Sequence, residues 1–171
     1  GLYTHAGPEV AVASTKAFVA QITAAYVLGL YLAQIKGAMF RDEIQQTLDS
    51  LKDMPRKIQW VLDTQTKAVH DAAAQMVDAK SFLFLGRHVG YPVAMEGALK
   101  LKEIAYTFTE GFAAGELKHG TIALIEEGTP VIGIVTDAKV AAHTRGNLKE
   151  VESRGARNIV IALESLAKPQ D

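Results

Sequence analysis

Residues 81–92 read SFLFLGRHVGYP, and this stretch decides the fold. The run SFLFL has the length of a strand and stops at Gly86, which predicts a short strand buried on both faces. A helical pattern then begins at Tyr91 and Pro92, since proline fits the first turn of a helix, where its missing N–H has no partner to lose. A buried strand that passes through a glycine turn into a helix is typical of proteins with a parallel α/β sheet.

The same alternation of strand and helix continues toward the C-terminal end. Further runs predict strands at residues 107–112, 130–135 and 158–163. Helical patterns cover residues 91–105, a shorter piece within 116–125, and residues 140–153, which Gly155 closes. Strands that are apolar throughout and alternate with helices indicate a parallel sheet covered on both faces, a three-layer αβα sandwich. Because so few strands are unusual for such a sheet, we expect at least one more strand beyond Asp171.

Helices alone are predicted before this region. One runs from Pro8 or Ser14 to Ile35 and is ended by Gly37, a second follows Asp42, and a third covers residues 57–79. We expect the third to bury the side chains Ile58, Val61, Leu62, Val69, Ala72 and Met76. These helices are interpreted as a connector between larger units.

Residues 17–35 could form a transmembrane helix by length and charge. The segment carries no charged residue, and about 18–20 residues are enough to span a bilayer. Polar residues recur within the segment, at Gln21, Thr23 and Gln34. We therefore expect a buried helix of a soluble protein and no membrane partner.

Composition excludes several classes of protein. The 171 residues are 49% hydrophobic and 22% charged, which excludes a disordered chain. With 18 basic and 19 acidic residues the net charge is −1, which argues against nucleic acid as the main partner. The chain has no cysteine, which removes disulfides, thiolate metal sites and cysteine nucleophiles. No histidine pair has metal-ligand spacing with a carboxylate, so we expect no metal or cofactor. Since no secretion signal opens the sequence, we expect a cytoplasmic protein.

Two segments carry candidate chemistry in the α/β region. The turn from Gly86 to Gly90 enters a helix at a strand end, where Arg87 could help to bind an anion, or the glycines could serve only a tight turn. On the following helix, Glu96, Lys100 and Glu103 fall on one face. They could form a proton-transfer group or an ordinary surface ladder of ion pairs. Gly97 inside this helix suggests close packing or a nearby ligand.

Two loops complete the candidates. His119 lies between Gly115 and Gly120 in a polar loop and could act as a proton shuttle or be an exposed loop histidine. The other histidines, His5, His70, His88 and His143, show no comparable setting. Ser14 and Thr15 could cap the first long helix, or the segment around them could bind a sugar or phosphate.

Three segments together resemble the isomerase half of the glutamine–fructose-6-phosphate aminotransferase family, the glucosamine-6-phosphate synthases. They are GPEVAVASTKAF at 7–18, the strand and helix from LGR at 85–87 through EGALKLKEI at 96–104, and AAGELKHG at 113–120. The resemblance implies sugar isomerase (SIS) domains, each a flavodoxin-like αβα sandwich. It assigns residues 1–36 to the end of a first SIS domain, 37–79 to connecting helices and 80–171 to a second SIS domain, incomplete at its C-terminus.

The resemblance also implies roles for individual residues. Glu103 matches the carboxylate that moves a proton between C1 and C2 of the open-chain sugar, and Lys100 matches a lysine beside it. His119 matches a histidine that helps to open the sugar ring and comes from the neighbouring subunit. Val12 and Ser14 match residues that contact the sugar.

The same resemblance implies partners and missing parts. The partners are a sugar-phosphate substrate, a glutaminase domain of the same parent chain and a second copy in a homodimer. The family's phosphate-binding loop is expected before residue 1, and its imine-forming lysine after residue 171. We therefore expect a fragment that is inactive alone. A regulatory SIS module without catalysis, or a related sugar-phosphate isomerase or deglycase, remains an alternative.

Overall fold

The computed structural model describes residues 1–167, and its contacts divide the chain into two compact units, Gly1–Asp71 and Ala72–Asp171. The first unit is helical and the second contains the sheet.

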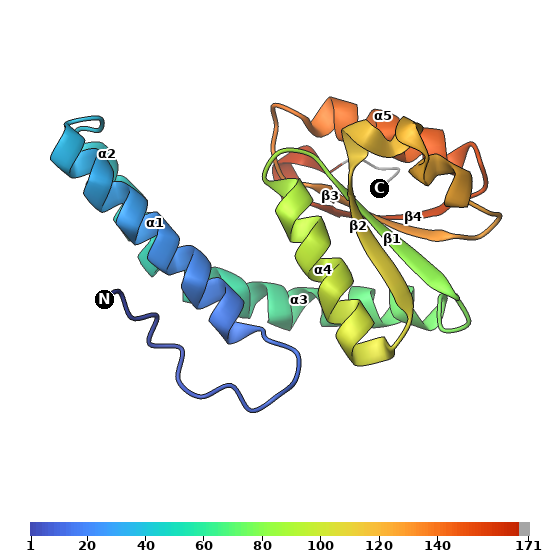
Figure 1. Cartoon of the computed structure of the whole chain (residues 1–171), viewed down its shortest axis with the longest axis horizontal. Helices are drawn as coiled ribbons and strands as arrows, with labels where there is room; N and C mark the ends of the chain where they lie inside the picture. The colour runs from blue at the N-terminus through green and yellow to red at the C-terminus, as the bar shows by residue number, and fades with distance from the viewer. Residues whose placement is uncertain (168–171) are drawn as a thin grey trace. The chain divides into compact units, whose positions relative to one another are not determined.

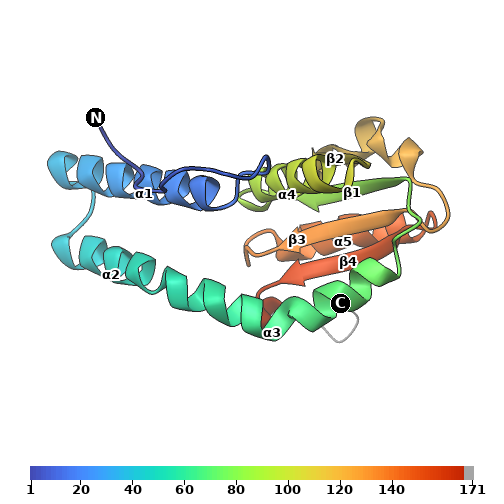
Figure 2. The ribbon, with the colours of Figure 1, turned by 90° about the horizontal axis from the view of Figure 1, so that it is seen from below.

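The N-terminal unit is built from three helices, α1 (Lys16–Lys36), α2 (Arg41–Lys52) and α3 (Met54–Ala74), the last of which continues into the second unit. Gly37 ends α1 in the left-handed region at φ 62°, as predicted, and its N–H donates to the carbonyl oxygens of Ala33 and Gln34. The short turn that follows lets α2 return along α1 in the opposite direction (Figure 2). The third helix begins earlier than expected and ends earlier, at Ala74.

The expected burial was wrong for α1 and for most of the third helix, although Ala72 and Met76 are half-buried. Leu30 is the single buried residue of α1, and no residue of α3 is buried. Ile58, Val61, Leu62 and Val69, which were expected inside, are all more than 40% exposed. Most apolar residues of α1 stay exposed because they lie all around the helix, whereas α2 can cover only one side of it. By length and composition alone, α1 is the one described helix that could cross a membrane, a test that core helices of soluble proteins also pass.

The second unit confirms the predicted three-layer parallel sheet. Its strands are β1 (Ser81–Gly86), β2 (Phe108–Ala113), β3 (Pro130–Val135) and β4 (Arg157–Ala162), all parallel in the order β2-β1-β3-β4. Helices α4 (Gly90–Ala105) and α5 (Ala141–Glu152) complete the layers. Figure 1 shows α4 alongside β1 and β2. Both helices and all four strands lie within about two residues of their predicted ends.

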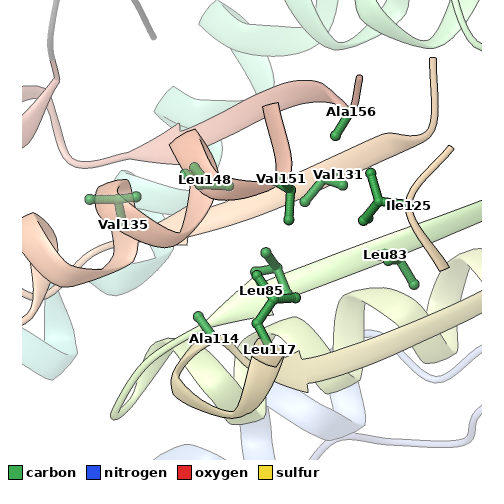
Figure 3. Packing of buried hydrophobic residues seen from close by; sticks show 10 residues of the cluster. All are labelled: Leu83, Leu85, Ala114, Leu117, Ile125, Val131, Val135, Leu148, Val151 and Ala156. Atoms are coloured by element: carbon green, nitrogen blue, oxygen red, sulfur yellow. The ribbon is translucent and has the colours of Figure 1, made fainter. Parts of the chain in front are cut away.

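Alternating side chains of the central strands point to opposite faces and form two cores. Leu83 and Leu85 of β1 pack with Val131 and Val135 of β3 against α5, where Leu148 and Val151 complete the cluster (Figure 3). Phe84 of β1 faces the other way and packs with Ile132 and Ile134 against Ala94 and Ala98 of α4. Burial on both faces explains why these strands are apolar at every position.

The connection from β2 to β3 differs from the predicted helical piece. It is formed by two 3-10 helices, η1 (Ala114–His119) and η2 (Thr121–Leu124). Ala114 and Leu117 of η1 are fully buried in the core on the α5 face. A third short 3-10 helix, η3 (Glu164–Leu166), follows β4.

Candidate functional site

The order of the strands reverses beside β1, and this defines the edge where ligands bind in such sheets. The chain passes from β1 to β2 on one side and then to β3 on the other side of β1. Gly86 at the end of β1 pairs in register with Ala113 of β2 and Ile134 of β3. In open parallel sheets the crevice outside the carboxyl ends, at such a reversal, is the usual ligand site.

The glycines of the β1–α4 turn have a packing role. A Cβ on Gly86 would lie 2.1 Å from the carbonyl oxygen of Gly90, and one on Gly90 would lie 3.2 Å from the carbonyl oxygen of Ile134. A side chain at Gly86 is therefore impossible without opening the turn. The tight-turn interpretation of this motif accounts for both glycines.

His88 in the same turn has a setting that sequence reasoning missed. It adopts a left-handed conformation at φ 52°, which is uncommon for a non-glycine residue. Its Nδ1 donates to Oδ2 of Asp137, which follows β3, at 2.6 Å. The pKa of Asp137 is lowered, first by the backbone N–H of Lys139 and then by His88. The pair joins the loops after β1 and β3, 49 residues apart, so no local pattern could have indicated it.

Arg87 is bound to the protein itself. Its Nε donates to Oδ1 of Asn147 on α5 at 3.0 Å, and Nδ2 of Asn147 donates to Oε2 of Glu150 at 3.3 Å. Oε1 of Glu150 lies 3.0 Å from Nζ of Lys118 on η1. The pKa of Glu150 is lowered, with the hydrogen bond from Lys118 as the largest cause. These four residues link the end of β1, α5 and η1.

Glu96, Lys100 and Glu103 share one face of α4, as the helical spacing predicted. Nζ of Lys100 donates to Oε2 of Glu103 at 2.7 Å and lies 3.4 Å from Oε1 of Glu96. The three side chains are 20–27% exposed. The pKa of Lys100 is raised, first by its hydrogen bond to Glu103, so the ammonium stays protonated at neutral pH. The arrangement offers a carboxylate held beside a fixed positive charge.

Gly97 lets α4 approach the sheet closely. A Cβ at this position would lie 2.8 Å from Cε1 of Phe84. Of the two explanations expected for this glycine, the structure supports close packing.

His119 and Glu103 do not meet within one chain. Glu103 lies near the end of α4, beside the amino end of β2, while His119 ends η1 beyond the carboxyl end of β2. The strand between them is about 20 Å long, at roughly 3.3 Å per residue. They also belong to opposite faces, because α4 covers one face of the sheet and Leu117, two residues before His119, packs in the core of the other. The imidazole of His119 is 77% exposed, with Nε2 3.7 Å from Glu116.

Val12 and Ser14 belong to the N-terminal unit, in the segment that precedes α1. Val12 is 92% exposed. Thr15 occupies the N-cap position of α1, but its side chain makes no capping hydrogen bond. The capping interpretation of this segment therefore receives no support at Thr15.

Among residues 1–167, no group of three or more histidines and carboxylates is placed to hold a metal ion.

Comparisons with known proteins relate the chain to curated and solved relatives. It is 62% identical over 167 residues to the glutamine–fructose-6-phosphate aminotransferase (isomerizing) of Corynebacterium efficiens and 53% identical to that of Mycobacterium tuberculosis. In both cases 95% of this chain is covered, but it spans only 27% of the relative. The resemblance found in the sequence is thus confirmed for a segment of these proteins.

Solved structures support the same relationship. The C-terminal domain of glucosamine-fructose-6-phosphate aminotransferase from Francisella tularensis superposes with a TM-score of 0.90 at 35% identity, over 95% of this chain and 46% of that one. A putative phosphosugar isomerase from Clostridium difficile 630 shares the fold, with a TM-score of 0.79 at 20% identity, over 93% of this chain and 44% of that one. The SIS domain family itself matches residues 75–168, more than half of the sequence. This chain belongs to the SIS domain family.

Proposed function

We propose that this chain is the part of a glutamine–fructose-6-phosphate aminotransferase that supplies the proton-transfer groups of its isomerase half. The observation that carries the proposal is the 2.7 Å contact between Lys100 and Glu103 on α4. It occurs in a chain that is 62% identical to the enzyme of that name from Corynebacterium efficiens. An ordinary surface ladder of ion pairs would also place Lys100 beside Glu103. It would not explain why the pair lies in EGALKLKEI, one of the three segments that resemble the aminotransferases.

In the proposed reaction, fructose 6-phosphate opens to its ketone form and ammonia converts the C2 carbonyl to an imine. Water leaves as the imine forms. The Glu103 carboxylate then takes a proton from C1 while the imine nitrogen gains a proton, which gives an enolamine. Return of the proton to C2, with loss of the proton of the O1 hydroxyl, leaves an aldehyde at C1 and an amine at C2. Such a transfer needs a positioned base and a nearby positive charge to stabilise the electron-rich intermediate. Lys100 meets the second need because its ammonium is held 2.7 Å from Glu103.

The proposal requires a second copy of the chain. Glu103 and His119 lie at opposite ends of β2 and on opposite faces of the sheet. If His119 helps to open the sugar ring, it must do so for the site of a neighbouring subunit. Val12 and Ser14 are proposed to contact the sugar. Because the chain spans 27% of its relatives, ammonia release is assigned to a glutaminase domain elsewhere in the parent protein.

The test compares the full-length parent protein with its Glu103→Gln variant, using fructose 6-phosphate and glutamine. Loss of a general base lowers kcat by about 100- to 10,000-fold. Sugar binding should change little, because glutamine keeps the shape of the side chain. Lys102→Gln serves as the control, since Lys102 is exposed on another face of α4.

Each outcome has a defined meaning. Product from the parent and from the control, with almost none from Glu103→Gln, supports the proposal. A folded parent that binds the sugar but forms no product would favour a regulatory SIS module. Product formed from a different sugar phosphate would favour a related isomerase or deglycase. The chain of 171 residues alone is expected to form no product, and substantial synthesis by it would contradict the proposal.

A further inference from the structure

We propose that Arg87 and Asn147 are positioning residues that hold η1 in place and so fix His119 for its part in opening the sugar ring. The inference rests on the proposed function. It assigns a role to Arg87, which the sequence had suggested as an anion ligand.

The first observation is the hydrogen bond between Arg87 and Asn147. Nε of Arg87 donates to Oδ1 of Asn147 at 3.0 Å, across 60 residues of sequence. Asn147 is only 8% exposed, and its Nδ2 donates to Glu150. A buried amide with both ends bonded fixes the guanidinium, since breaking either bond leaves a buried polar atom without a partner.

The second observation is the contact between Arg87 and η1. A Cβ on Gly115 would lie 3.2, 3.3 and 3.4 Å from Nη1, Nη2 and Cζ of Arg87. The guanidinium therefore fills the space that a side chain at position 115 would need. Glycine at this position lets η1 and Arg87 lie side by side.

The third observation is that the other end of η1 is held as well. Lys118 lies 3.0 Å from Glu150, the same carboxylate that accepts from Asn147. Leu117 is fully buried in the core beneath. The segment is therefore attached at Gly115, Leu117 and Lys118, while the next side chain, His119, is 77% exposed.

His119 is therefore an exposed imidazole on a backbone that is held in place. A displacement of about 1 Å in a catalytic group can cost about a hundredfold in rate. Loss of the Arg87–Asn147 bond would free the guanidinium beneath Gly115 and shift His119 without touching it. The position of the Arg87 guanidinium is thus set by the hydrogen bond from its Nε to Asn147.

The test uses the full-length parent protein with Asn147→Leu and, separately, Arg87→Lys. Leucine keeps the branched shape of Asn147 without its hydrogen bonds, and lysine keeps the charge of Arg87 without its planar group. The matched control is Lys149→Met, an exposed cation on the same helix. Each variant is assayed with fructose 6-phosphate and with 5-deoxyfructose 6-phosphate. The analogue has no 5-hydroxyl to close a furanose ring, so its turnover needs no ring opening.

We expect both variants to lower kcat for fructose 6-phosphate by about ten- to a hundredfold, with KM changed by less than about threefold. With the open-chain analogue their loss should shrink to less than about threefold. His119→Asn should show the same selective loss, and Glu103→Gln should lose turnover of both substrates. Lys149→Met should match the parent throughout.

The possible failures are distinguishable. If the variants lost kcat equally with both substrates, Arg87 and Asn147 would have only a structural role, and the inference would be overturned. Full activity in both variants beside a selective loss in His119→Asn would overturn it too, while the proposed function stands. Full activity in Glu103→Gln would refute the proposed function itself. If Asn147→Leu does not fold, Arg87→Lys decides the question alone.

Discussion

Replacing Gly97 by alanine tests how closely α4 is packed on the sheet. The added Cβ would lie 2.8 Å from Cε1 and 3.1 Å from Cδ1 of Phe84. Carbon atoms in good contact are about 3.5–4.0 Å apart, so the helix or the ring must move by about 0.7 Å. Phe84 has little freedom to yield, because β1 is bonded on both sides, by β2 and β3. Such overpacking costs about 1–3 kcal/mol.

The expected net effect is smaller, since alanine favours the helix over glycine by about 1 kcal/mol. Gly97→Ala should therefore change the free energy of unfolding by between about zero and 2 kcal/mol, in the destabilising direction. Gly146→Ala is the matched control, because it makes the same exchange inside α5 with nothing within 4 Å of the new Cβ. It should stabilise the protein by about 1 kcal/mol.

The assay is thermal unfolding of the chain followed by circular dichroism. The helix preference is common to the two variants and cancels, so their difference isolates the packing cost of about 1–3 kcal/mol. For a unit of this size each kcal/mol shifts Tm by about 4–8 °C, so Gly146→Ala should melt at least about 4 °C above Gly97→Ala. If both variants raised Tm by the same amount, Phe84 would not restrict α4 and the reasoning would be refuted.

Two further predictions concern the carboxyl edge of the sheet. Leu117→Ala should lower the free energy of unfolding by about 2–5 kcal/mol, because the side chain is fully buried. Urea unfolding measures the change. His119→Ala, two residues along and exposed, should alter the free energy of unfolding little. Equal stability of Leu117→Ala and the parent would contradict the burial of Leu117. Asp137→Asn should remove a pH-dependent contribution, since the folded-state pKa of Asp137 lies below its ordinary value of 3.8. That contribution is present above this value and is lost as the pH falls through the folded-state pKa. The stability difference between parent and variant should thus shrink as the pH falls from about 5 to below 3.8, and a constant difference would contradict the prediction.

The strands were predictable because their environment is uniform. β1 and β3 have neighbours on both sides and helices on both faces, so their sequences are continuous apolar runs. The end of α1 at Gly37 was also predictable, because helices often end at a residue in the left-handed conformation and glycine adopts that conformation most easily. The segment after β2 was harder, because two 3-10 helices leave no regular period for a short helical pattern to match.

Burial of the N-terminal helices could not be judged from the pattern of their own residues. An apolar stripe such as that of α3 shows which side prefers to be covered, but not whether the chain supplies the cover. The ion pairs on α4 were predictable because they join residues three and four apart. The pairs His88–Asp137 and Arg87–Asn147 were not, since each joins a strand end to a partner dozens of residues away.

The strand order also has a consequence for synthesis on the ribosome. β1 leaves the ribosome first among the strands, but both of its neighbours come later in the chain. The end of β3 follows the start of β1 by about 50 residues, so at about 5–20 residues per second β1 waits about 3–10 s for its second partner. During that interval Phe82, Leu83, Phe84 and Leu85 form a nascent apolar segment with open edges. Chaperone binding during translation is expected to concentrate on this segment until β3 emerges.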